Sequence, residues 1–207
     1  MAIEAKFRIT DPGIFWSLQT IDHLAKYSLS KTEIAAIEDA YLDTKKRRLL
    51  AAGYCCRRRN QGKGFLITLT KLRLGKDTDQ KPKQWEVRLK KNKNGPADWP
   101  KSQARSRVLK VVPNKKLQVI FAFNQTRITR RISNGKQVIA RAHLDLVSLM
   151  INGKEQHFKI LKLKIIAPNQ EKHLNALTAA LQAKWPLESE PLSKFERALA
   201  MEKGKNK

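Results

Sequence analysis

The chain has 207 residues, of which 43 are Lys or Arg and 18 are Asp or Glu, so its formal net charge is +25. A hydrophobic fraction of 41% argues against a disordered chain, and no apolar run reaches the roughly 20 residues that a membrane-spanning helix needs. The N-terminus shows no apolar signal segment, and two adjacent cysteines exclude a disulfide framework or a four-ligand zinc site. We therefore expect a cytoplasmic protein without a membrane span, whose charge attracts polyanions.

Alternation of polar and apolar residues predicts strands, because successive side chains of a strand point to opposite faces. Turn residues between the strand-like runs, such as 60–64 (NQGKG), 133–136 (SNGK) and 152–153 (NG), favour antiparallel connections. We expect eight strands, near residues 3–9, 34–43, 54–60, 64–71, 84–90, 118–132, 138–145 and 161–165.

Helices are fewer and are marked by capping residues. Asp11 as N-cap and Pro12 at the first helical position predict a helix that runs to about Ala25. Further helices are expected at 45–52, closed by Gly53, and at 101–111, 170–184 and 193–201. The chain shows no internal repeat or flexible linker, so we predict a single domain over 1–202 and a basic tail at 203–207.

The polar faces of the predicted strands are rich in Arg and Lys. If the sheet closes with these faces inward and helices cover the apolar faces, a barrel with a cationic interior results. If the sheet stays open, the same residues form a basic plate, and periodicity alone does not choose between the two. The cations on these faces are Lys6, Arg8, Arg57, Arg59, Arg88, Arg127, Arg131, Arg141, Lys162 and Lys164.

Short motifs run along nearly the whole chain, at 2–6 (AIEAK), 41–44 (YLDT), 49–54 (LLAAGY), 57–59 (RRR), 64–69 (GFLITL), 85–87 (WEV), 125–127 (QTR), 144–145 (LD) and 193–199 (SKFERAL). Their order resembles the CYTH domain, the family of triphosphate tunnel metalloenzymes, in which 2–6 matches the ExExK signature. The resemblance implies an α+β fold with an eight-stranded antiparallel β-barrel, or tunnel, and flanking helices. It also implies that basic residues hold a triphosphate or polyphosphate while paired glutamates hold Mg²⁺ or Mn²⁺.

The resemblance also implies site residues. The metal ligands carried over are Glu4, Glu86 and Asp145. The phosphate-binding residues carried over are Lys6, Arg8, Arg57, Arg59, Arg88, Arg127, Arg141, Lys162 and Lys194.

Several acids of the family pattern are missing from this sequence. Ala2 stands at the first glutamate of ExExK, Gln84 at one of the paired acids of 84–86, and Ile160, Lys162 and Lys164 at the acids of a later strand. The ten strand-face cations then outnumber the three remaining carboxylates by seven, which disfavours divalent ions. This pattern predicts the loss of two-metal chemistry. It is still compatible with the binding of a single Mg²⁺ or Mn²⁺ ion.

Two function classes follow. The first is a catalytically degenerate CYTH-like domain that binds polyanions, with RNA in a ribonucleoprotein such as the ribosome preferred over polyphosphate or DNA. The alternative is a metal-dependent tripolyphosphatase, or another polyphosphate-processing enzyme, that uses the same tunnel. A deliberately supercharged variant of a CYTH protein is a third reading. The first hypothesis rests on cations outside the barrel, for example Lys45, Lys46, Arg47, Arg48, Lys90, Lys91, Lys93, Lys115, Lys116 and the tail at 203–207.

Overall fold

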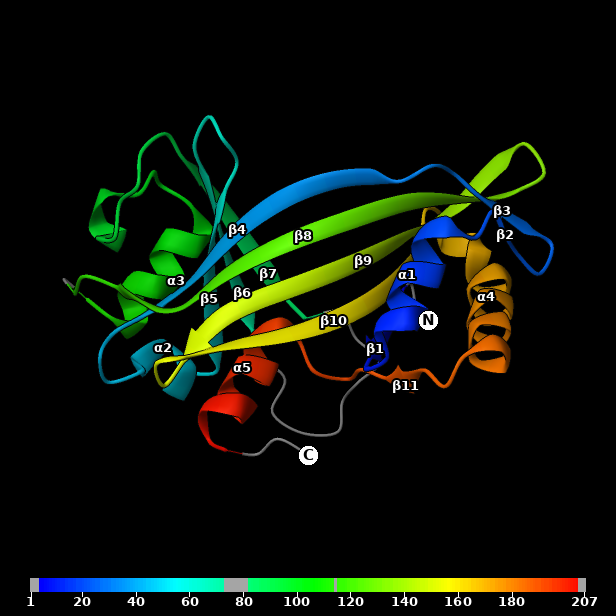
Figure 1. Cartoon of the computed structure of the whole chain (residues 1–207). Helices are drawn as coiled ribbons and strands as arrows, with labels where there is room; N and C mark the ends of the chain where they lie inside the picture. Colours follow the sequence, from blue (N-terminus) through cyan, green and yellow to red (C-terminus); the bar gives the residue numbers. More distant parts are fainter. Residues whose placement is uncertain (1–3, 73–81, 114, 205–207) are drawn as a thin grey trace. The chain divides into compact units, whose positions relative to one another are not determined.

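The computed structural model describes residues 4–72, 82–113 and 115–204 (Figure 1). Ala2 and Ile3 of the N-terminal motif lie outside the described residues, as does the end of the basic tail at 205–207. No helix of the described part is long and apolar enough to cross a membrane. The strands are β1 (Glu4–Ile9), β2 (His23–Leu24), β3 (Tyr27–Leu29), β4 (Glu33–Asp43), β5 (Tyr54–Asn60), β6 (Phe65–Lys71), β7 (Gln84–Leu89), β8 (Gln118–Asn134), β9 (Gln137–Ile151), β10 (Lys154–Ile165) and β11 (Glu188–Ser189).

The strands join in one large sheet, which confirms the predicted α+β class. The order is β11-β1-β10-β9-β8-β4-β5-β6-β7, with the β2–β3 pair attached to β8. Antiparallel register is explicit for β1 with β10 and for β4 with β5, β5 with β6 and β6 with β7. The predicted closed barrel of eight strands is not what this pairing gives. Among the described residues the strand order is an open path, and the sheet has eleven strands. The prediction lacked β2, β3 and β11, because strands of two or three residues are too short to show alternation.

The chain divides into two compact units, and each is described by itself. Unit 1 comprises Met1–Ala36, Gln125–Ser148 and Glu155–Ser193, and unit 2 comprises Ile37–Asn124, Leu149–Lys154 and Lys194–Lys207.

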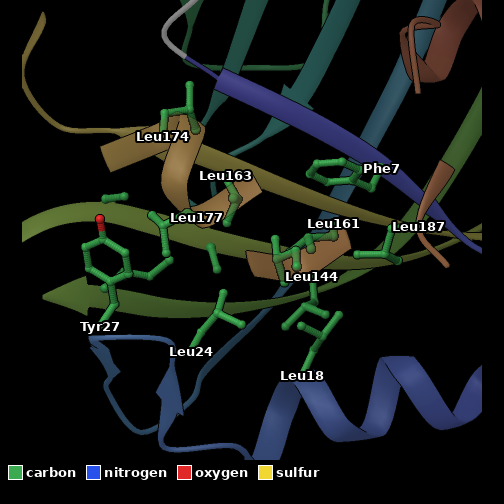
Figure 2. Packing of buried hydrophobic residues seen from close by; sticks show 14 of the residues in the cluster. Phe7, Leu18, Leu24, Tyr27, Leu144, Leu161, Leu163, Leu174, Leu177 and Leu187 are labelled. Carbon is green, nitrogen blue, oxygen red and sulfur yellow. The ribbon is translucent and has the colours of Figure 1, made fainter. Parts of the chain in front are cut away.

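The core of unit 1 lies on the apolar face of its strands. Phe7 of β1 is paired with Leu161 of β10, and both are buried together with Leu144 of β9 (Figure 2). Leu18 of α1 (Pro12–Thr20) and Leu177 of α4 (Glu171–Lys184) pack into the same cluster. Burying each such side chain stabilises the fold by roughly 1.5–3 kcal/mol. The apolar half of the alternation is therefore used in packing, and the polar half is left on the other face.

Unit 2 has a core of the same kind. Leu42 of β4, Ile67 of β6 and Val87 of β7 bury their side chains against Val108 of α3 (Gln103–Val111) and against Trp99, which follows η1 (Pro96–Asp98). The α3 helix begins where Ser102 Oγ accepts a hydrogen bond from the Arg105 backbone N–H. The helix covers one face of β6 and β7, so the alternate side chains of these strands lie on the opposite face.

Two helices, α1 and α2 (Arg48–Ala51), are shorter than the sequence predicts by four or more residues, whereas α3 and α4 begin within two residues of the predicted positions. The helix α1 ends at Thr20 rather than near Ala25, because the chain turns into the β2–β3 pair and Arg130 Nη1 binds the carbonyl of Ile21 at 2.6 Å. The helix α2 spans Arg48–Ala51 instead of 45–52, because the Asp43 carboxylate accepts hydrogen bonds from the N–H groups of Leu49 and Leu50 and sets its start. The last helix, α5 (Lys194–Glu202), agrees with the prediction to within one residue, and a 3₁₀ turn, η2 (Pro168–Gln170), precedes α4.

Candidate anion-binding faces

The polar side chains of unit 1 gather on one strand face, which we call face 1. In the register of β1 with β10, Lys6 is opposite Lys162 and Glu4 is opposite Lys164, while the intervening residues face the core. Face 1 consists of Glu4, Lys6, Arg8, Arg127, Arg141, His143, Asp145, Lys162, Lys164 and Glu188.

Asp145 on β9 is held by Arg127 on β8. The Arg127 Nε and Nη2 atoms donate to the two carboxylate oxygens at 2.7 and 2.8 Å, and Gln125 Nε2 adds a donor at 3.4 Å. Only 3% of the Asp145 side chain is exposed, against 19% for Arg127. A bidentate pair in such a buried position fixes both side chains, so both oxygens of this carboxylate already have donors.

Lys162 lies in the middle of face 1. Its Nζ atom is 3.8 Å from Glu4 Oε2, and 26% of its side chain is exposed. Burial lowers the pKa of Lys162, the Glu4 carboxylate opposes that shift, and Arg127 lowers the pKa further. An ammonium group in these surroundings gains from any additional anion that approaches it.

The neighbouring β1 cations are anchored at the rim. Lys6 Nζ donates to the carbonyl of Leu192 at 2.8 Å, and Arg8 forms an ion pair with Glu188 of β11. The partners of both side chains therefore lie within residues 188–192, which include the edge strand β11.

His143 is neutral at ordinary pH. Burial, followed by the charges of Arg127 and Lys162, lowers its pKa to about 4, although Asp145 opposes this. Its Nδ1 atom lies 3.0 Å from Thr129 Oγ1 on β8. A neutral imidazole adds no charge of its own, so the positive charge of face 1 comes from its Lys and Arg side chains.

Unit 2 carries a second polar row, face 2, with Asp39, Tyr41, Arg57, Arg59, Thr68, Glu86 and Arg88 on strands β4 to β7. Asp39 is buried and accepts two hydrogen bonds from Arg59, at 2.7 and 2.6 Å. Arg57 Nη2 donates to Thr68 Oγ1 at 3.2 Å, and Thr68 Oγ1 donates to Glu86 at 3.3 Å. The buried Nε of Arg57 finds no hydrogen-bond acceptor among the described residues and lies 4.0 Å from Asp39.

The predicted phosphate-binding residues therefore fall into two groups. Lys6, Arg8, Arg127, Arg141 and Lys162 share face 1. Arg57, Arg59 and Arg88 share face 2, and Lys194 begins α5 in unit 2.

The acids of face 1 that were predicted as metal ligands, Glu4 and Asp145, lie beside basic side chains. Within the described part of the chain, no three His, Cys, Asp or Glu side chains lie together as metal ligands do. On face 1, Asp145 is bound by Arg127, and Glu4 is beside Lys162 and opposite Lys164. Mg²⁺ is commonly held by one or two carboxylates together with waters and substrate oxygens. Because both of these acids are already beside cations, face 1 does not fit a divalent ion.

Sequence reasoning missed two buried residues, Asp39 and Arg130. Asp39 is a buried acid on β4, and alternation with an Arg-rich neighbouring strand is the signal that marks it. Arg130 lies on the core side of β8, where it donates to backbone carbonyls, and nothing in the local sequence separates it from Arg131.

The fold is that of an α+β protein whose large, mainly antiparallel sheet carries clusters of Lys and Arg on its strand faces. The sequence matches the CYTH domain over residues 1–199, and the chain belongs to that family. A search of curated proteins gave no match.

Two solved structures share the fold. One is a Hippeastrum protein described as a candidate adenylyl cyclase with a dominant triphosphatase activity. Its TM-score is 0.65 at 18% identity, over 100% of this chain and 98% of that chain. The other, a candidate adenylate cyclase from Bacillus halodurans, has a TM-score of 0.59 at 16% identity, over 95% of this chain and 96% of that chain. At these identities the likeness establishes the fold alone.

Proposed function

We propose that this protein binds a triphosphate or longer polyphosphate chain along its cationic strand faces. The observation that carries the proposal is the convergence of Lys6, Lys162, Arg127 and Arg141 on face 1 from four strands. Membership of the CYTH family and the triphosphatase activity of the Hippeastrum relative support the same substrate class. Ammonium and guanidinium groups are the side chains that best neutralise phosphate oxygens.

The charge of face 1 suits a multiply charged anion. Its six Lys and Arg side chains face three carboxylates, Glu4, Asp145 and Glu188, which leaves three positive charges uncompensated. Strong repulsion among these cations is relieved when an anion enters, so binding is expected to be strongly dependent on salt.

The proposal is tested by calorimetric titration with tripolyphosphate, pyrophosphate and sulfate at two ionic strengths. We expect affinity to fall in that order and to weaken with salt. Lys162→Gln and Arg141→Gln should each weaken tripolyphosphate binding about tenfold, because each removes a charged hydrogen-bond donor. The control Lys136→Gln, in the exposed turn between β8 and β9, should leave the affinity unchanged. Failure of tripolyphosphate to bind, or equal affinity in all variants, would exclude the proposal.

Hydrolysis of the bound chain is the alternative function. The observation in its favour is the activity of the Hippeastrum relative. A tripolyphosphatase would release phosphate with Mg²⁺ or Mn²⁺, and the release would fall on Glu4→Ala or Glu86→Ala. Absence of release above a heat-treated control would remove this alternative while leaving the binding proposal intact.

RNA binding is a further candidate because unit 2 exposes many cations that are not part of face 2. An RNA backbone on this surface would be bound without sequence preference and with a steep salt dependence. The exposed residues are Lys45, Lys46, Arg48, Lys90, Lys91, Lys93, Lys115 and Lys116. Replacing four of them by Gln should reduce the RNA affinity and also the steepness with which that affinity falls as salt is added, whereas Lys162→Gln should alter neither.

A further inference from the structure

Lys162 and Lys164 place two ammonium groups on the strand face that also carries Glu4. Leu161 and Leu163 of the same strand are buried in the core of unit 1, so the alternating lysines must lie on the opposite face. Their partners on β1 confirm this, because Lys6 is opposite Lys162 and Glu4 is opposite Lys164.

The carboxylates of face 1 are already neutralised by side chains. Both oxygens of Asp145 accept hydrogen bonds from Arg127, and Glu4 is 3.8 Å from the Lys162 ammonium group. Glu188, the remaining acid, is in an ion pair with Arg8. An entering divalent cation would have to displace these cations from their acids, which would break the existing ion pairs. Like-charge repulsion would then oppose its staying among the displaced cations.

An ammonium group can take over part of the role of such an ion. It is a compact positive charge with three hydrogen-bond donors, and phosphate oxygens accept from it in many directions. Lys162 has the position for this role, since the Arg127 and Glu4 side chains lie beside it and most of its own side chain is buried.

We propose that face 1 holds its phosphate chain with the ammonium groups of Lys162 and Lys164 in place of a divalent metal ion, so that binding is independent of metal. This inference rests on the proposed polyphosphate binding. It follows that Mg²⁺ or Mn²⁺ in solution competes with the protein for the anion and weakens binding instead of supporting it.

The test is a calorimetric titration of the full chain with tripolyphosphate, once in EDTA and once with excess Mn²⁺. For the unaltered protein we expect tighter binding in EDTA than in excess Mn²⁺. Lys162→Glu should lose about tenfold or more in EDTA and regain affinity with Mn²⁺, because the new acid together with Glu4 offers oxygen ligands to the ion. Lys162→Gln should weaken binding in both buffers without rescue by Mn²⁺.

Lys136→Glu is the matched control, since it makes the same change of charge in an exposed turn of unit 1 and should not alter the response to Mn²⁺. Urea denaturation establishes that each variant is folded, and if Lys162→Glu does not fold, the unaltered protein and Lys162→Gln decide the question. Binding by the unaltered protein that requires Mn²⁺ overturns the inference and leaves the proposed function standing. Absence of binding in both buffers overturns the proposed function as well.

Discussion

The buried pair of Arg127 and Asp145 gives the sharpest prediction about face 1. Replacing Asp145 by Asn keeps the shape of the side chain and one acceptor oxygen but removes the charge beside Arg127. The pair has 2.7 and 2.8 Å hydrogen bonds, and its side chains are 19% and 3% exposed. A unit-charge interaction at such range is worth about 4 kcal/mol at an effective dielectric constant of 20, and breaking a buried pair typically costs 3–5 kcal/mol.

We therefore expect Asp145→Asn to lower the free energy of unfolding by about 2–4 kcal/mol, since the amide retains part of the hydrogen bonding. The same change should raise the affinity for tripolyphosphate about fivefold in EDTA, because it removes one negative charge from the anion site. A metal-dependent site predicts the reverse for affinity, since it would lose a ligand.

Urea denaturation, monitored by tryptophan fluorescence, measures the free energy of unfolding of Asp145→Asn, Arg127→Gln and the double variant. The double-mutant cycle should give a coupling energy of about 2 kcal/mol or more. Glu155→Gln, an exposed acid of β10, is the control and should change stability by less than about 0.5 kcal/mol. Additive single-variant effects, or lower affinity for tripolyphosphate in Asp145→Asn, would refute the reasoning.

Three further predictions concern individual residues. Arg130→Met should destabilise the protein by about 3 kcal/mol in urea denaturation, because the buried guanidinium donates to four backbone carbonyls, whereas Arg131→Met on the exposed side should cost less than 1 kcal/mol. Asp43→Ala should lower the free energy of unfolding by about 2 kcal/mol, because its carboxylate accepts from three backbone N–H groups, those of Thr44 and of Leu49 and Leu50 in α2, and an unchanged melting temperature would contradict this. The pKa of His143 is lowered from 6.5 to about 4, so between those pH values the unfolded chain takes up a proton that the folded chain does not, and stability falls as pH falls. Allowing for partial solvation of the ring, about 1–2 kcal/mol is lost over this window, and His143→Gln should show a shallower decline in urea denaturation at a series of pH values.

Strand alternation predicted the polar and apolar faces well because both are local properties of the chain. Residues 3–9 and 161–165 were expected to carry Lys6 and Lys162 on a charged face, and the pairing of β1 with β10 places them opposite each other. The α+β class and the family follow from the same patterns.

The open strand path and the role of Arg130 depend on contacts between residues far apart in the chain. Arg130 binds the carbonyls of Ser30 and Leu18, which are 100 and 112 positions away, so a local sequence window contains no trace of its role. The short strands β2, β3 and β11 are likewise defined by pairing with other strands and not by a pattern in their own residues. For example, β11 is paired with β1, where Glu188 is opposite Arg8. Whether the predicted site residues bind phosphate stays a prediction.

A single titration decides whether the strand-face cations bind a phosphate chain. Tripolyphosphate is added in EDTA to the unaltered protein, to Lys162→Gln and to Lys136→Gln, at the same salt concentration. We expect saturable binding by the unaltered protein and by Lys136→Gln, and about tenfold weaker binding by Lys162→Gln. Binding that is absent in all three proteins, or equally tight in all three, would contradict it.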